Sequence, residues 1–139
     1  MNNIETFGGV KRQRNLVTEV AHFCIEKLMP RMRSFDIEIL LTKLGGAKGY
    51  CLMTDNNRTF EIEIEKKMSD QEIITTVCHE MVHVKQYARK EITDTKGYWK
   101  GNIITEDQIA VMFPWETEAY RLEKYLTIKF NERKVNDLL

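Results

Sequence analysis

Three neighbouring residues, His79, Glu80 and His83, have the types and the spacing to bind a metal ion and to activate water on it. Residues four positions apart lie on the same face of a helix, so the two imidazoles can bind one ion together. The carboxylate next to the first imidazole can then accept a proton from a water molecule on that ion. The segment therefore predicts metal-assisted hydrolysis, provided that it folds as a helix.

The flanking sequence predicts a helix that begins near Ser69. Ser69 followed by Glu72 is a capping-box pattern, and neither proline nor glycine occurs between positions 69 and 92. At about 100° per residue, His79 and His83 lie roughly opposite an apolar stripe, so one face can pack on a core while the other faces a cleft. This register disfavours the alternative of two surface histidines on an ordinary amphipathic helix. The stripe consists of Ile73, Ile74, Val77, Met81, Val84 and Ala88.

The pattern H-E-x-x-H is the motif of zinc metallopeptidases, and catalytic zinc usually takes three protein ligands and one water molecule. The metzincin extension of the motif is not matched, because Gln86 stands at its glycine position and Arg89 at its final histidine position. The remaining histidine, His22, has apolar neighbours on another predicted helix, and we expect it to be a packed or surface histidine rather than a ligand. The third ligand is therefore predicted to be a carboxylate from a separate element.

Two glutamates near the start of the last predicted helix are candidates for this ligand. Glu116 and Glu118 follow Pro114, in the first turns, where the positive end of the helix dipole favours carboxylates. Ala119 is small enough to let this helix approach the motif helix closely. Their helical positions do not separate the two glutamates, and both could instead serve only as charges at the helix start.

With both segments considered, the chain resembles small gluzincin-type zinc metallopeptidases, in which H-E-x-x-H is followed on a later helix by a glutamate in the pattern E-x-x-A. Glu116 and Ala119 match that pattern, so the resemblance implies Glu116 as the third zinc ligand, with Glu118 as the alternate. SprT-like and ImmA/IrrE-like proteases, compact intracellular or phage-borne proteins, are the nearest comparisons. The resemblance covers residues 69–123 and departs at Tyr120, where many relatives carry Asp or Asn.

The resemblance implies a Zn²⁺-dependent endopeptidase in which Glu80 is the general base for zinc-activated water. The oxyanion that forms at the scissile carbonyl needs a further donor, and Tyr98, Tyr120 and Tyr87 are the candidates. The polypeptide substrate is expected to bind in an extended conformation along residues 98–104, used as an edge strand.

Two other functions are compatible with the same motif. One is a non-proteolytic zinc-binding regulatory or partner-binding module, against which the intact Glu80 argues, because a structural zinc site needs no general base. The other is a SprT-like protease acting on DNA-bound proteins. The balance of 21 basic and 21 acidic residues gives no general attraction to nucleic acid, and the cysteine spacing excludes a SprT-type zinc ribbon.

The pattern of apolar residues predicts a single α+β domain over residues 1–139, with residues 1–11 loosely ordered. Helices and strands alternate as in a small domain whose helices pack on one mostly antiparallel, three-stranded sheet, and the resemblance implies a zincin-like minidomain. The predicted order is a helix at about 12–29, strands around 37–41, 50–52 and 60–64, the motif helix, a short edge strand at 98–104 and a ligand helix from 114 to about 130.

Composition and cysteine usage predict a cytoplasmic protein, of cellular or phage origin, with no membrane partner. No apolar run is long enough to cross a bilayer, and the first residues do not resemble a secretory signal. Cys24, Cys51 and Cys78 are widely spaced and odd in number, which is typical of reduced packing residues.

Overall fold

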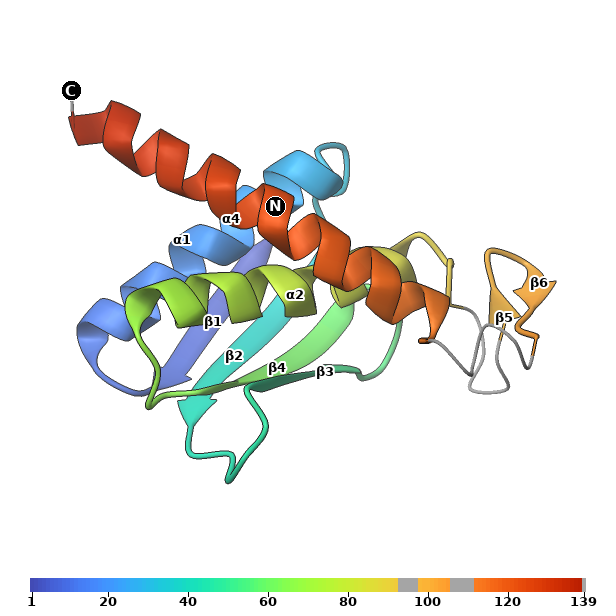
Figure 1. Cartoon of the computed structure of the whole chain (residues 1–139), viewed down its shortest axis with the longest axis horizontal. Helices are drawn as coiled ribbons and strands as arrows, with labels where there is room; N and C mark the ends of the chain where they lie inside the picture. The colour runs from blue at the N-terminus through green and yellow to red at the C-terminus, as the bar shows by residue number, and fades with distance from the viewer. Residues whose placement is uncertain (93–97, 106–111, 139) are drawn as a thin grey trace.

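A four-stranded β-sheet with helices packed on one face forms the centre of the molecule (Figure 1). The computed structural model describes residues 1–92, 98–105 and 112–138. Over these residues the protein is α+β, with three helices and a mixed sheet. The elements are β1 (Asn3–Gly8), α1 (Lys11–Leu28), β2 (Asp36–Thr42), β3 (Gly49–Met53), β4 (Thr59–Glu65), α2 (Asp70–Ala88), β5 (Tyr98–Trp99), β6 (Asn102–Ile103) and α4 (Pro114–Leu138).

The strand order in the sheet is β1-β2-β4-β3, which corrects the prediction of three mostly antiparallel strands. β1 pairs with β2, and β2 with β4, in parallel, and only the β3–β4 pair is antiparallel. Alternation of apolar residues tells which side of a strand faces the core but not which strand lies beside it. The inward residues of the inner strand β4, Phe60, Ile62 and Ile64, are all buried, whereas Met53 on the same side of the edge strand β3 is 37% exposed.

The N-terminal segment is a strand, although the sequence predicted that residues 1–11 would be loosely ordered. β1 lies parallel to β2, with Ile4 opposite Ile37. The Asn2 side chain adds an anchor, because its Oδ1 accepts a hydrogen bond from the Phe35 amide at 2.9 Å. Such pairing joins residues that are more than thirty positions apart, and a short local pattern does not reveal it.

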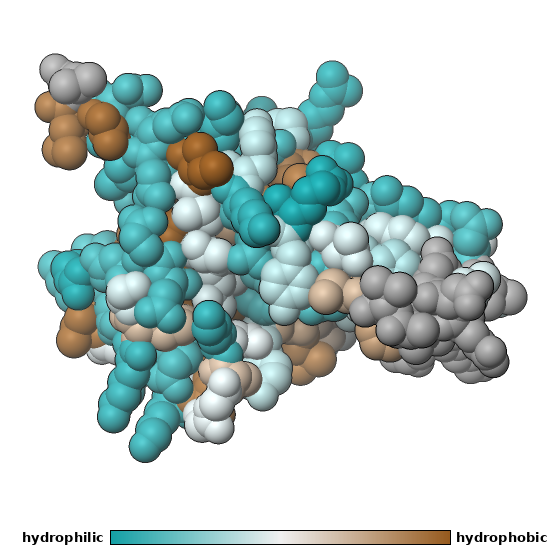
Figure 2. Space-filling view, in the orientation of Figure 1, coloured by the Kyte–Doolittle hydropathy of each residue, from teal (hydrophilic) through white to brown (hydrophobic). Residues whose placement is uncertain are grey.

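The helices form two layers above the sheet. α1 packs on β1 and β2, α2 packs on β3 and β4, and α4 lies across α2 on the side away from the sheet (Figure 1). Near its C-terminal end α4 also reaches α1, where Arg133 pairs with Glu26 at 3.0 Å and Lys134 with Glu19 at 2.9 Å. The viewed face is mostly hydrophilic, with apolar side chains in small separate groups (Figure 2).

The motif helix α2 begins as predicted, with Ser69 as its N-cap. Glu72 N donates to Ser69 Oγ at 3.2 Å, and the Glu72 carboxylate accepts from the Ser69 amide in return. The predicted apolar stripe is buried over its whole length. Burial of this stripe fixes the rotation of α2 about its axis, so the face that carries His79 and His83 points away from the stripe.

The segment predicted as an edge strand at 98–104 is instead a small hairpin outside the main sheet. Within the described ranges, β5 and β6 pair with each other and with no other strand, with Tyr98 opposite Ile103, and Trp99 forms one isolated bridge to Ile92. α4 begins at Pro114 as predicted and continues to Leu138, beyond the predicted end near residue 130. Among the described residues, no helix has the length and apolar character needed to cross a bilayer.

Candidate metal centre

Helices α2 and α4 bring the two motif histidines to one carboxylate. Glu116 Oε1 lies 2.6 Å from His83 Nε2 and 3.5 Å from His79 Nε2. Ala119, one turn further along α4, is fully buried, consistent with its predicted role of letting the two helices approach closely. Two imidazole nitrogens and one carboxylate oxygen therefore converge on a single point.

The second nitrogen of each histidine ring is held by its own partner. His79 Nδ1 lies 3.0 Å from Glu123 Oε1, and His83 Nδ1 lies 2.8 Å from Gln86 Oε1. A carboxylate and an amide oxygen only accept hydrogen bonds, so each Nδ1 is the donor. In the neutral imidazole this leaves the Nε2 lone pair free, which is the tautomer that binds a metal through Nε2.

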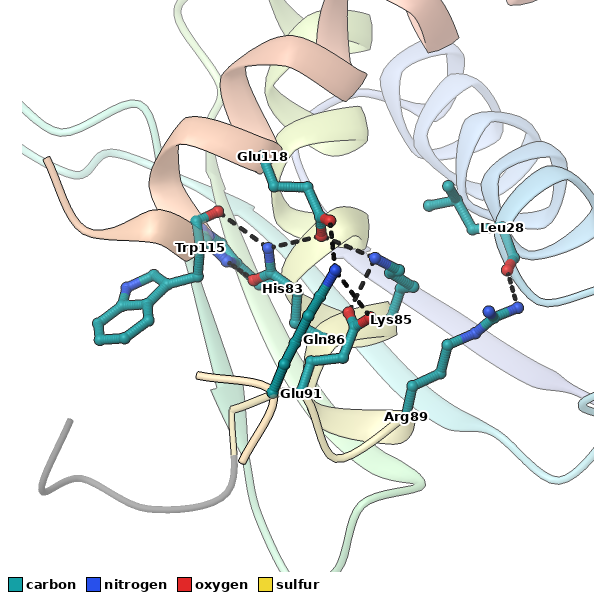
Figure 3. Close-up of polar contacts among 9 residues, drawn as sticks. Leu28, His83, Lys85, Gln86, Arg89, Glu91, Trp115 and Glu118 are labelled. Carbon is teal, nitrogen blue, oxygen red and sulfur yellow. Dashed lines mark hydrogen bonds and ion pairs between the residues drawn. The ribbon is translucent and has the colours of Figure 1, made fainter. Parts of the chain in front are cut away.

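The orientation of the Gln86 amide follows from its other contacts (Figure 3). Its nitrogen donates to the carbonyl oxygen of Trp115 at 2.9 Å and to Glu118 Oε1 at 3.1 Å, and both partners can only accept. The amide oxygen must therefore face His83. Gln86 is fully buried, so these contacts fix the ring of His83 through a chain of hydrogen bonds that starts on α4.

Glu118, predicted as the alternate ligand, lies in this supporting network. Its Oε1 accepts from Lys85 Nζ at 2.7 Å as well as from Gln86 (Figure 3). Burial disfavours its charged form, but the hydrogen bonds from Lys85 and Gln86 outweigh burial and lower the pKa of Glu118. Lys85 also pairs with Glu91 at 2.8 Å. The two candidates therefore differ in their contacts. Glu116 contacts the two histidines, whereas Glu118 contacts Lys85 and Gln86.

Glu80 is buried beside His79 and His83, and one oxygen of its carboxylate lacks a partner among the described residues. The residue is 5% exposed, and its Oε2 has no hydrogen-bond partner in the described part of the chain. Burial raises the pKa of Glu80, the two histidines lower it, and the nearby carboxylates Glu116 and Glu123 raise it again, for a net increase. A buried carboxylate with a free oxygen and a raised pKa suits a proton acceptor.

The residues present fit a divalent metal ion. Donor atoms of His79, Glu80 and His83 lie within 4.8 Å of one another, and Glu116 contacts both histidine Nε2 atoms. Imidazole and carboxylate donors suit divalent transition metals, zinc and iron among them. Both imidazoles are oriented by hydrogen bonds at Nδ1, which is the usual arrangement of metal-binding histidines.

The three tyrosines predicted as donors lie at different distances from this centre. The Tyr120 ring lies 4.8 Å from the His79 ring and borders the cleft. Tyr87, on α2, borders the other side of the cleft near Glu80. Tyr98 belongs to the β5–β6 hairpin. The structure therefore brings Tyr120 and Tyr87, rather than Tyr98, to the cleft that contains Glu80.

Strand β3 forms the wall of the cleft opposite α4. Two adjoining pockets share Gly49, Glu80, His83 and Glu116, so the candidate centre lies where they meet. A Cβ atom at Gly49 would stand 2.8 Å from Thr76 Cγ2, so glycine allows β3 to pass close to α2 at this point. Among the residues that the structure describes, the sheet edge next to the centre thus belongs to β3 and not to residues 98–104.

No protein family, curated protein or solved structure was found to match the chain. The geometry of the site is therefore the main support for any function. Sequence reasoning missed Glu123 and Gln86 as partners of the histidines. Both had a usable signal, since Glu123 lies two helical turns after Glu116 and Gln86 lies three residues after His83 on the same helix.

Removal of the carboxylate behind His79 should weaken metal binding without abolishing it. We expect Glu123→Ala to lower zinc affinity about 10- to 100-fold, because the ring loses the partner that fixes its tautomer and orientation. Competition with a chromogenic chelator measures the affinity. Lys124→Ala, at the adjacent exposed position of α4, is the matched control, and equal affinities for the two variants would contradict this role.

Zinc affinity should rise with pH up to about pH 9. Burial disfavours the charged form of His79, but hydrogen bonds to Glu116 and Glu123 and the charge of Glu80 raise its pKa from 6.5 to about 9 in the metal-free protein. Below that value zinc must displace a proton, so affinity should fall about tenfold per pH unit of acidification. A zinc affinity that does not change between pH 7 and 9 would contradict displacement of a proton from His79.

The raised pKa of His79 has the opposite effect on the stability of the metal-free protein, which should fall as pH rises. A pKa raised on folding stabilises the folded state fully below the unfolded value of 6.5, and this contribution is lost as pH rises through about 9. Chemical unfolding of the metal-free protein at several pH values measures it. The metal-free protein should become less stable over the interval in which zinc binds more tightly.

Proposed function

We propose that the protein is a zinc-dependent metallopeptidase of zincin-like fold that hydrolyses peptide bonds. One observation carries the proposal. The Nε2 atoms of His79 and His83 converge on Glu116 Oε1, and beside them Glu80 presents a buried carboxylate oxygen that has no partner among the described residues. A purely structural metal site has no use for such a group.

The residues of the chain divide the chemistry among them. Zinc, when held by His79, His83 and Glu116, supplies a Lewis acid that polarises the scissile carbonyl and acidifies water. Glu80 accepts the proton of the attacking water and passes it to the amine that leaves. Tyr120, the candidate tyrosine whose ring contacts His79, is the best placed to donate to the oxyanion.

The substrate is proposed to be a polypeptide that binds in an extended conformation along β3. In the order β1-β2-β4-β3, one side of β3 pairs with β4, and no strand of the described residues pairs with its other side. β3 borders the cleft at Gly49, so a chain paired with its free edge passes the candidate centre. Such pairing supplies main-chain hydrogen bonds with little demand on sequence. This placement replaces the predicted one at residues 98–104.

A reducing, intracellular compartment suits the proposal, because Cys24, Cys51 and Cys78 are all free thiols. Cys24 Sγ donates a hydrogen bond to Cys78 Sγ at 3.8 Å in the core, and the two thiols are not joined as a disulfide. Burial, together with the neighbouring Cys78, raises the pKa of the Cys24 thiol, which disfavours its reactive thiolate form.

The proposal is tested with zinc-loaded protein, unfolded casein and mass spectrometry of the products. We expect new peptide termini that disappear after treatment with a chelator and return when zinc is added. Bound zinc without cleavage of casein or of a peptide library would contradict the proposal and favour the non-proteolytic zinc-binding module.

A further inference from the structure

The cleft has two halves of different chemical character, which meet at Gly49, Glu80, His83 and Glu116. One half, called here the apolar half, has a volume of about 600 Å³ and is bordered beyond the shared residues by Tyr50, Cys51, Met53, Tyr87, Ile92 and Trp115. The other, the polar half, is bordered by residues that include Lys48, Gln71, Glu72, Thr75, Thr76 and Glu123.

We infer that the protein cleaves polypeptides beside a large apolar residue, whose side chain occupies the apolar half, while the residue across the scissile bond occupies the polar half. The inference rests on the proposed function. It adds a substrate class that the metal-binding motif does not specify.

The apolar half is formed by side chains that are held in place. Tyr87 packs its ring 6.2 Å from that of Phe60 in the core. Trp115 stacks on Phe113 at 4.7 Å between ring centroids, and its carbonyl oxygen is bonded to the buried Gln86. On β3, Met53 lies on the same side of the strand as Gly49. A fixed apolar surface of this kind gains free energy when it covers an apolar side chain.

Beyond the shared residues, the polar half is bordered by one large aromatic ring, that of Tyr120, and otherwise by charged or polar side chains. Thr76 Oγ1 donates to the carbonyl oxygen of Glu72 at 2.7 Å, and Thr75 shares a hydrogen bond of 3.1 Å with Thr127. Glu123 is held by His79, and Lys48 is exposed. Burial of a large apolar residue there would remove water from the exposed side chains of Lys48, Gln71 and Glu72 without replacing its hydrogen bonds. The two sides of a bound substrate should therefore differ in polarity.

A peptide library with every residue type at each position tests the inference on zinc-loaded wild-type protein. Mass spectrometry identifies the cleaved bonds. We expect Phe, Tyr, Leu or Met on one fixed side of the bond to be preferred over Asp, Ser or Lys by about 10- to 100-fold in kcat/KM. On the other side polar residues should be accepted.

The variant Met53→Lys assigns the preference to the apolar half. Met53 is 37% exposed, so a lysine there keeps its ammonium near solvent and should not prevent folding. We expect the apolar preference to fall at least about tenfold and acidic residues to be better accepted at the same position. Leu40→Lys is the matched control, because Leu40 is equally exposed at 37% but lies on β2, away from the cleft, and its variant should retain the wild-type preference.

The outcomes separate the inference from the proposed function. Cleavage spread evenly over residue types would overturn the inference and leave the peptidase proposal intact. An apolar preference that Met53→Lys does not alter would also overturn it, because the apolar half would then not be its source. No cleavage of any peptide by zinc-loaded protein would overturn both.

Discussion

Replacing Glu80 with glutamine is expected to lower kcat/KM for peptide hydrolysis by about 10²- to 10⁴-fold while the protein still binds one zinc ion. Glutamine has nearly the same shape as glutamate but cannot accept the proton of the attacking water, so the change removes general-base catalysis. The proposed ligands His79, His83 and Glu116 are unchanged, and loss of the buried charge of Glu80 should not weaken folding. Peptide hydrolysis and metal analysis of the same sample measure both quantities.

The control for this variant is Glu63→Gln. Glu63 lies on β4, in a row that alternates with the buried residues of the strand and faces away from the helices. Its variant should retain wild-type activity. Equal cleavage by the Glu80→Gln and wild-type proteins would remove Glu80 from the mechanism, and a Glu80→Gln protein without zinc would make the loss of activity uninformative about the base and point to a ligand role.

Replacing Glu116 with glutamine is expected to lower zinc affinity by more than about 100-fold, beyond the range typical of residues that only orient a ligand. Glu116 Oε1 contacts the Nε2 atoms of both histidines, so the variant removes the charged donor from the centre. An amide oxygen is a much weaker ligand for zinc than a carboxylate. Isothermal titration calorimetry with zinc measures the change.

Glu118→Gln is the matched variant, two residues along the same helix. It should keep zinc affinity within about tenfold, because Trp115 still holds the Gln86 amide. It should lower the free energy of unfolding by about 1–3 kcal/mol, because Lys85 loses a close charged partner in a mostly buried place. The opposite result, with zinc lost in Glu118→Gln and retained in Glu116→Gln, would reverse the assignment of the third ligand.

The motif helix was predictable because its signals are local. The capping box at Ser69 and Glu72, the apolar stripe and the spacing of the histidines all lie within one helix, and the structure has the predicted start and register. The choice of Glu116 over Glu118 needed the resemblance, since helical position alone did not separate them. In the structure the difference arises from Lys85 and Gln86, which engage Glu118 from α2.

Features that depend on pairing between distant segments were not predictable in the same way. β1 forms because Ile4 and its neighbours pair with β2, which follows it in the chain after helix α1. The parallel pairing of β2 with β4 arises because β4 lies between β2 and β3 in the sheet. The position of β3 at the cleft depends on that order. Residues 98–104 looked like an edge strand locally, but the edge beside Glu80 belongs to β3.

The decisive experiment for a zinc peptidase is titration of the metal-free protein with zinc, with the rate of peptide hydrolysis followed at each step. We expect the rate to rise linearly until one zinc ion is bound per chain and then to stay constant. Tight binding of one zinc ion at His79, His83 and Glu116 with no hydrolysis of a diverse peptide library would contradict it.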